Sequence, residues 1–417
     1  MSAGAIEVVD LLARWVHLIA GIMWIGNSFL WNWMDRNLES PHTDARSITP
    51  SPTGSIWLLH SGAFYYAEKT LLAGAPMPAR LHWFRWQAYT TWWTGLALLI
   101  TVYWVGGRAA LTDPGVAALT HGTAVAVGAG GIILGLLIYE FAHRVLAPRS
   151  IALATAFWLT GLTAISFVFT ELLSGRAALL HVGAMIGTLM AGNVVFTIMP
   201  AQRELVASVG APPSAAGAGS TASARAKRVS IDNNYFVFPV ILLMMTSHYS
   251  ALYGQPRVWI PLAIIVAGGA GARHLLNIRF AFAPWKPALT ATIVLTAGAL
   301  YASVVFSRSA PPTLAVETGP VEFADVRHLI DRRCSSCHAS EPSDLTFGIA
   351  PGGVRFDSPE QIVAMAARIQ QRVVADQTMP PANKTLMTAA ERDLLRRWIA
   401  EGARLNSVPT AAVQLPR

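Results

Sequence analysis

Cys334, Cys337 and His338 form a C-x-x-C-H run near the C-terminus, and their types and spacing can carry redox chemistry. In such a run the two thiols add across the vinyl groups of a haem, and the adjacent histidine ligates its iron. Methionine is a common second axial ligand and raises the reduction potential. Met379 lies downstream in a Thr-Met-Pro-Pro segment whose prolines stiffen the loop. We therefore predict a covalent haem c held by Cys334, Cys337, His338 and Met379.

Other uses of a C-x-x-C pair are thioredoxin-like redox sites and half of a zinc site. A redox dithiol does not need His338, and zinc would need a second pair of ligands. Cys334 and Cys337 are the only cysteines in the chain, so a four-thiolate site cannot form. Met387 and Met365, the latter in a helical pattern, compete with Met379 as the axial ligand.

The composition is that of a membrane protein. Of the 417 residues 53% are hydrophobic and only 13% are charged, about half the charged fraction of soluble proteins. The net charge of +8 comes from basic residues scattered through short loops, so we expect no nucleic-acid partner. The first residues carry Glu7 and Asp10 rather than a basic region, which predicts no cleavable signal peptide.

Apolar stretches of about 20 residues can cross a bilayer as helices. The chain has about eight of them: Val8–Trp33, Trp86–Val105, Gly115–Ile138, Ile151–Leu173, Ala177–Met199, Tyr235–Tyr253, Val258–His274 and Pro287–Phe306. We therefore predict an all-α fold. A membrane helix bundle over residues 1–306 is followed by a linker (307–320), a small class I cytochrome c domain (321–405) and a tail (406–417).

Basic residues predict the orientation, because cytoplasmic loops are enriched in Lys and Arg. With the N-terminus outside, most basic residues, Arg273 and Arg279 among them, fall in inner loops. An even number of spans then returns the C-terminus to the outside, where bacteria attach haem c. We expect a multi-pass protein of the bacterial inner membrane with the haem domain on the periplasmic side.

Two loops interrupt the pattern of spans. Ser55–Leu72 is partly apolar but too polar to cross, and we expect an interfacial or re-entrant helix there. Ala211–Ala226 is rich in Ala, Gly, Ser and Pro and reads as a flexible cytoplasmic linker.

Helices are expected on both sides of the haem motif. Phe323, Val326 and Leu329 define an apolar helical face before it, and Thr388–Gly402 is an amphipathic segment after it. Thr388 followed three residues later by Glu391 predicts a capping box.

Four histidines fall in the outer half of the predicted spans: His17, His121, His181 and His248. Two of them, with His17 and His248 the deeper, would be able to hold a haem b between helices. Alternatively each is an interfacial or hydrogen-bonded histidine. Gly26-Asn27 and Gly192-Asn193 indicate either an internal repeat or, as we favour, interhelical amide bonds.

Five segments occur in order through the membrane part: His17–Asn27, His60–Tyr65, Leu81–Trp92, Asn233–Phe236 with Phe238–Val240, and Ser247–Tyr249. Together with the haem motif they resemble the bacterial membrane-integral urate oxidases fused to a cytochrome c domain. The resemblance implies oxidation of urate to 5-hydroxyisourate with water as the oxygen source. Electrons would leave through the cytochrome rather than to O2, towards a respiratory oxidase or a soluble cytochrome c.

Urate is a flat monoanion, so its site should offer a cation, amide groups, an aromatic wall and a base that activates water. Candidates on the outer side are Arg14, Asn27, Trp24 and Glu171. Those on the cytoplasmic side are His60, Glu68 and Arg85. Arg85 also fits a snorkelling span flank and Glu68 a solvated face. Electron-transfer distance favours the outer side.

Two other functions fit parts of the sequence. One is a membrane-anchored electron-transfer cytochrome that oxidises quinol or another donor without urate chemistry. An anchor, however, needs only one span. The other is a transporter that gained a cytochrome, which would require more ligands along a transport path than the spans contain.

Overall fold

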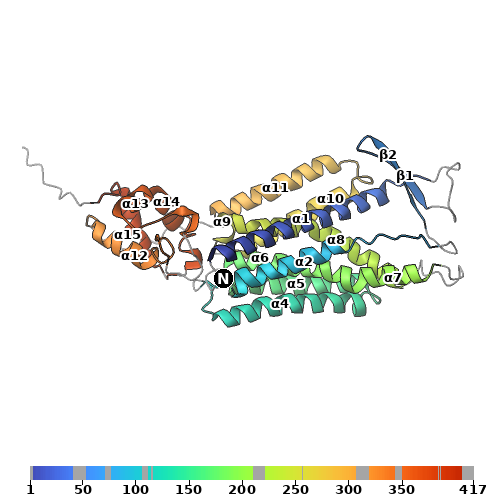
Figure 1. The fold of residues 1–417 in the computed structure, drawn as a ribbon, viewed down its shortest axis with the longest axis horizontal. Coiled ribbons are helices and arrows are strands. Elements are labelled where there is room, and N and C mark those ends of the chain that lie inside the picture. Colours follow the sequence, from blue (N-terminus) through green and yellow to red (C-terminus); the bar gives the residue numbers. More distant parts are fainter. Residues whose placement is uncertain are drawn as a thin grey trace, which may run out of the picture.

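Long helices form most of the computed structural model, which describes residues 3–40, 53–70, 77–105, 111–113, 116–209, 221–255, 257–306, 319–342, 350–383, 385 and 387–405. A helical bundle and a smaller helical unit at one of its ends are visible in Figure 1. The bundle comprises α1 (Ala3–Arg36), α2 (Trp86–Leu99), α4 (His121–Phe141), α5 (Ile151–Leu172), α6 (Gly175–Asn193), α7 (Met199–Ala207), α8 (Thr221–Met245), α9 (Ser250–Tyr253), α10 (Trp259–Ile278) and α11 (Trp285–Phe306). Three π-helical segments continue α2, α4 and α6: η1 (Ile100–Val105), η2 (Ala142–Leu146) and η3 (Val194–Ile198).

Seven helices of the described chain are long and apolar enough to cross a membrane, which is compatible with a membrane protein. They cover seven of the predicted spans. The remaining one, Trp86–Val105, is helical throughout as α2 and η1 and packs against α1 and α6. Gln87 and a series of threonines make its first half more polar than the other seven.

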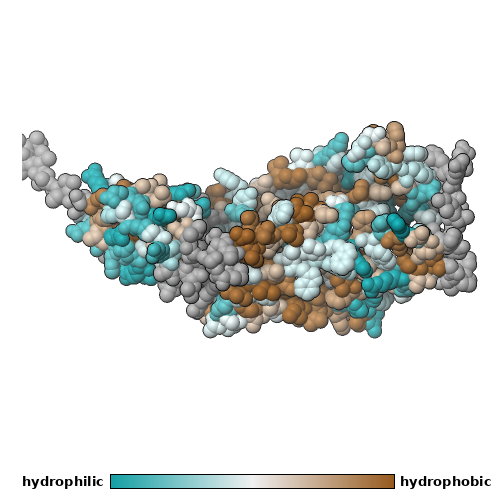
Figure 2. All heavy atoms as spheres, in the orientation of Figure 1, coloured by the Kyte–Doolittle hydropathy of each residue, from teal (hydrophilic) through white to brown (hydrophobic). Residues whose placement is uncertain are grey.

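The bundle and the C-terminal unit differ in polarity. Apolar side chains cover much of the bundle, whereas the C-terminal unit is largely hydrophilic (Figure 2). The last helix of the bundle, α11, has no buried residue, and Phe306 at its end is 85% exposed. Such a helix suits contact with lipid rather than water. α11 ends at the end of the bundle where α1 begins, and the C-terminal unit lies beyond that end (Figure 1).

The expected helix at Ser55–Leu72 is wrong: this segment forms an antiparallel hairpin of β1 (Gly54–His60) and β2 (Ala63–Lys69). Ser61 and Gly62 connect the strands with φ of 51° and 76°, as a two-residue hairpin turn requires. Across the strands the Trp57 and Tyr66 rings lie 4.8 Å apart. Aromatic and β-branched residues favour strands, and here they outweigh the helical interpretation. The fold is therefore mostly helical rather than all-α.

The predicted linker Ala211–Ala226 is also partly wrong, because α8 already begins at Thr221. Residues 210–220 lie outside the described residues, as do 307–318 of the second linker and the tail 406–417.

The centre of the bundle is α6, which packs against α2, α4, α5 and α8. Glycines on α4 allow the close approach. A Cβ atom at Gly128 would lie 2.7 Å from His181 Nε2, and one at Gly135 would lie 2.7 Å from Met185 Sδ. Larger residues at these positions would push α4 away from α6.

The C-terminal unit contains α12 (Phe323–Arg333), α13 (Pro359–Ala364), α14 (Ala366–Ile369), the π-helical η7 (Gln370–Ala375) and α15 (Ala389–Ala400). Its core joins both flanking helices, α12 through Ile330 and α15 through Leu395 and Trp398. The predicted helices before and after the C-x-x-C-H motif are confirmed. The capping box is confirmed as well: the Thr388 hydroxyl accepts from Glu391 N, and the Glu391 carboxylate accepts from Thr388 N.

Candidate functional site

The C-x-x-C-H motif begins where α12 ends, and the cysteines are free thiols. The His338 ring is held in place by its Nδ1, which lies 3.0 Å from the Val354 carbonyl oxygen. A proton on Nδ1 leaves Nε2 free to ligate a metal, the arrangement common to histidine ligands. Gly352 and Gly353, with φ of 63° and 68°, make the turn that brings this carbonyl to the ring.

Met379 lies in a loop that is hydrogen-bonded to Arg392 of α15. The Arg392 guanidinium donates to the carbonyl oxygens of Met379 (2.8 Å) and Val373, and Met379 N donates to Arg372 O at 2.9 Å. The Met379 side chain packs at the edge of the core and is half-buried. The competing Met387 is 3% exposed within the core, and Met365 lies at the break between α13 and α14.

These features fit a covalent haem c, which Cys334, Cys337, His338 and Met379 would hold. The alternatives fit less well. Burial and the neighbouring Cys337 raise the pKa of the Cys334 thiol to about 12, whereas a redox dithiol needs a lowered pKa. The described residues contain no group of three or more His, Cys, Asp or Glu side chains arranged to hold a metal ion such as zinc.

The structure joins two of the four outer histidines through one tryptophan. Trp104 Nε1 donates to His181 Nε2 at 3.1 Å, and the Trp104 carbonyl oxygen lies 2.8 Å from His121 Nε2. His181 is fully buried, with Nδ1 2.8 Å from Ala177 O. Both histidines are therefore hydrogen-bonded in the structure.

The other two outer histidines, His17 and His248, lie in different surroundings from this group. His17 Nδ1 lies 2.9 Å from the Thr91 carbonyl oxygen and 3.1 Å from Thr94 Oγ1, on α2. His248, in the short helix η5 (Thr246–His248), is exposed.

A buried polar network is centred on three consecutive residues of α8, Asp232, Asn233 and Asn234. The first of them faces α4. Asp232 Oδ2 accepts a hydrogen bond of 2.7 Å from the Tyr139 hydroxyl and lies 3.0 Å from His143 Nε2. His143 is in the π-helical η2, and π-helical turns in α-helices occur frequently at functional sites.

The second residue faces α6. Asn193 Nδ2 donates to Asn233 Oδ1 at 2.7 Å and to the Tyr139 hydroxyl at 3.1 Å, and Asn233 Nδ2 donates to Met190 O. This confirms the interhelical amide bond expected for Asn193. The π-helical η3 follows directly.

The third residue faces α10 and α1. Arg273 Nε donates to Asn234 Oδ1 at 2.6 Å, and Asn234 Nδ2 donates to Asn277 Oδ1 at 2.9 Å. The Arg273 guanidinium carbon lies 4.3 Å from the centre of the Phe29 ring and 5.6 Å from that of Phe238. Arg273 is 6% exposed, so its assignment to an inner loop is wrong: it is a buried residue of α10.

The structure does not bring the predicted substrate residues together. Arg14 is exposed and paired with Asp10, Glu171 is exposed at the end of α5, and Asn27 and Trp24 are half-buried on α1. On the opposite side, His60 and Glu68 belong to the hairpin. The Arg85 guanidinium lies over the Trp83 and Trp86 rings, as a snorkelling flank does.

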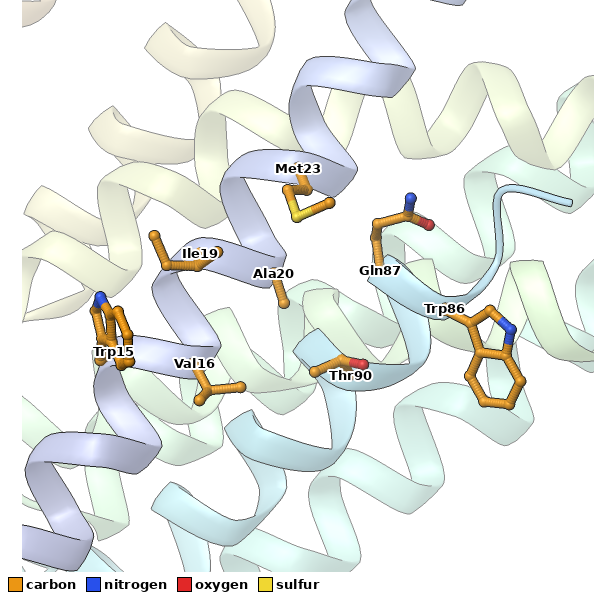
Figure 3. A pocket seen from close by; sticks show the side chains of 8 residues that line it. All are labelled: Trp15, Val16, Ile19, Ala20, Met23, Trp86, Gln87 and Thr90. Carbon is orange, nitrogen blue, oxygen red and sulfur yellow. The ribbon is translucent and has the colours of Figure 1, made fainter. Parts of the chain in front are cut away.

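A groove of about 360 Å³ lies between α1 and α2, where Gln87 and Thr90 of α2 face α1 (Figure 3). Its lining is apolar apart from these two residues and contains no charged group: Trp15, Val16, Ile19, Ala20, Met23, Trp86, Gln87 and Thr90. Such a lining suits an acyl chain better than an anion.

The α8 network was missed among the candidate site residues. A signal was nonetheless present for part of the network: Asn233-Asn234 directly precede the apolar stretch Tyr235–Tyr253, and Arg273 lies within the apolar stretch Val258–His274.

Comparison with known proteins identifies the family of the helical bundle. The family model of the urate oxidase N-terminal region matches residues 3–305. No curated protein and no solved structure matches the chain. The matched region contains the whole helical bundle, including the α8 network, and ends just before the C-terminal unit. The chain therefore belongs to the urate oxidase N-terminal family.

Proposed function

We propose that the chain is a membrane-bound urate oxidase that passes electrons to its own C-terminal haem c rather than to O2. The observation that carries the proposal is the family match over residues 3–305, followed in the same chain by the C-x-x-C-H motif. The family links the bundle to urate and to oxidoreductase activity, and the motif supplies an electron acceptor.

The reaction balances without O2. Urate and one water molecule give 5-hydroxyisourate, two protons and two electrons. The new C–O bond forms from water, so a protein group has to accept a proton. When bound, a haem c supplies a one-electron acceptor, and two electrons therefore leave in two successive transfers.

The C-terminal unit supports this role through the positions of its own residues. The Val354 carbonyl orients His338 with Nε2 free, and Arg392 fixes the loop of Met379. A neutral imidazole and a thioether are the ligand pair of high-potential cytochromes c, which suits an acceptor of electrons from an organic substrate. The next acceptor would be a respiratory oxidase or a soluble cytochrome c on the periplasmic side of the inner membrane.

The α8 network offers groups that can take up the protons. His143 Nε2 and the Asp232 carboxylate lie 3.0 Å apart, and the Tyr139 hydroxyl donates to the same carboxylate oxygen, so these three groups are close enough to pass a proton from one to the next. We assign the network to proton transfer.

The second candidate is an electron-transfer cytochrome that oxidises quinol. It is favoured by the apolar groove between α1 and α2, which lacks the cation that urate needs.

One experiment separates the two functions. The purified full chain is mixed anaerobically with urate or with a quinol, and the absorbance band of reduced haem c is followed. We expect reduction by urate, and no reduction in the control variant His338→Ala. Reduction by quinol alone would establish the second function, and absence of a thioether-linked haem would refute both.

A further inference from the structure

We propose that Arg273 binds the negative charge of the substrate, within a cage formed by Phe29, Asn234, Phe238 and Asn277. The inference rests on the proposed function and deepens it, because it locates the urate site between α1, α8 and α10. These residues supply a cation, amide groups and an aromatic wall, three of the four features that a flat anionic heterocycle requires.

Arg273 is a buried cation whose contacts are uncharged. Within the described chain its hydrogen-bond partner is the amide oxygen of Asn234, and its other contacts are the faces of Phe29 and Phe238. The charged groups that act on it, Arg36 and Arg279, are also cations. Burying a charge without a counter-ion is costly, and inside a membrane such residues are typically functional. An anion placed here would offset that cost.

The shape of the cage selects a flat ligand with polar edges. The Phe29 and Phe238 rings meet edge to face, with centroids 6.1 Å apart, and form an aromatic wall beside the guanidinium. The guanidinium donates in one plane, and the amides of Asn234 and Asn277 can pair with the N–H and C=O groups of a purine edge. On binding, the anionic edge replaces Asn234 Oδ1 as the acceptor of Arg273.

Pro239 and Gly269 lie beside the cage, where α8 meets α10. Pro239 lies inside α8 and removes one hydrogen bond of the helix just beyond Asn234 and Phe238. Gly269 of α10 packs against this proline, where an added Cβ would lie 2.9 Å from Pro239 N. Because Arg273 is buried, urate binding requires α8 to move away from α10 near this proline.

The Tyr139–His143–Asp232 group does not line this cage. Successive helical residues are rotated by about 100°, so Asp232 and Asn234 point to nearly opposite sides of α8. Substrate binding and proton uptake are therefore on different faces of the same helix, and Asn233 connects both to α6.

The position of the cage also assigns the side of substrate entry. α10 begins at Trp259 near the end of the bundle that carries the C-terminal unit (Figure 1), and Arg273 lies about 21 Å further along at 1.5 Å per residue. Urate then enters from the side opposite the C-terminal unit, which is not the side that electron-transfer distance favours.

The test measures urate binding and turnover by the full chain, comparing wild type with Arg273→Met and Arg273→Lys. The matched control is Arg149→Met, an exposed arginine that donates to Val145 O at the end of α4. We expect Arg273→Met to weaken urate binding by about 10- to 100-fold, the loss typical of a charge-assisted hydrogen bond. Arg273→Lys should restore part of the affinity, and the control should stay within about twofold of wild type.

A second ligand distinguishes binding from a structural role. Tetramethylated urate carries no charge, so its weak binding should be the same in wild type and Arg273→Met. Wild-type affinity for urate in Arg273→Met, or an equal loss for both ligands, would overturn the inference. If Arg273→Met aggregates, Asn277→Leu keeps the cation and should weaken urate binding about 5- to 10-fold; unchanged binding would also overturn it. A wild-type chain that neither binds nor oxidises urate would instead refute the proposed function.

Discussion

At the scale of single residues, local chemistry and long-range contacts differ in how well the sequence predicts them. The C-x-x-C-H run is informative because thioether formation and iron ligation need residues that are adjacent in the chain. The contacts that orient these residues come from distant segments: Val354 for His338 and Arg392 for the Met379 loop. No local pattern marks those two residues.

Met379→Ala should lower the midpoint potential of the haem by on the order of 100 mV or more, because a weaker axial ligand replaces the thioether. Covalent attachment should be unaffected, since Cys334 and Cys337 remain. A spectroelectrochemical titration of the full chain measures the potential, with Met365→Ala as the control. An unchanged potential in Met379→Ala would exclude Met379 as the axial ligand.

Arg273 illustrates the opposite case. Counting basic residues by loop assigned it to the inner surface, although it lies in a helical pattern beside apolar residues. The side chain is buried because Asn234, Phe29 and Phe238 from two other helices surround it. Only the packing of α1, α8 and α10 reveals this environment.

At the scale of elements, the apolar spans were predictable because length and composition decide them. The hairpin at Gly54–Lys69 was not, because a short segment with aromatic residues satisfies both a helical and a strand pattern. The Ser61-Gly62 turn was the signal that favoured strands.

The amide bond between α6 and α8 should contribute about 1 kcal/mol, typical of interhelical hydrogen bonds in membranes. Asn193→Ala removes the donor to Asn233 Oδ1, so we expect a lower temperature of thermal aggregation in detergent. Asn37, a half-buried residue directly after α1 whose side chain donates to Trp33 O of that helix, provides the control Asn37→Ala. Equal thermal stability of the two variants would show that the bond contributes little.

The cap of α15 stabilises the C-terminal unit. Thr388→Ala removes the acceptor for Glu391 N and should cost about 1 kcal/mol in the free energy of unfolding. Chemical denaturation of the full chain, followed by the haem c spectrum, measures this loss. No change in the denaturation midpoint would contradict the role of the cap.

The same cap predicts a dependence on pH. Burial opposes ionisation of Glu391, but hydrogen bonds from Thr388 N and the Arg333 guanidinium, 2.9 Å away, lower its pKa below the ordinary 4.5. The ionised Glu391 therefore stabilises the folded state fully above pH 4.5, its ordinary pKa. This stabilisation is lost as the pH falls through the lower pKa that Glu391 has in the folded state. Glu391→Gln should therefore have a lower free energy of unfolding than wild type at neutral pH, and that free energy should change less as the pH falls below 4.5. Chemical denaturation at several pH values measures both effects. A parallel acid response in wild type and variant would contradict this assignment.

At the scale of the whole molecule, α1 begins and α11 ends at the same end of the bundle, and the C-terminal unit follows there (Figure 1). The proposed urate cage lies towards the opposite end, which separates substrate from haem by much of the bundle. An intermediate electron carrier would shorten the transfer. A haem b held by two of the histidines His17, His121, His181 and His248 is one of the two alternatives that the sequence left open, and it would provide such a carrier.

The orientation in the membrane that the basic loops predict can be measured directly. A protease site inserted between Ser208 and Thr221 should resist protease added to spheroplasts and be cut in inverted vesicles. The same site placed before Val321 should show the reverse pattern. Cleavage of the first site in intact spheroplasts would invert the proposed topology.

The central claim is that electrons from urate reach the C-terminal haem of the same chain without O2. The most direct measurement is an anaerobic titration of the oxidised full chain with urate, in which reduced haem c is counted against the urate consumed. The account predicts two reduced haems c per urate, after allowing for any electrons held by a second haem. Urate that is consumed only when O2 is admitted, with haem c remaining oxidised under argon, would contradict it.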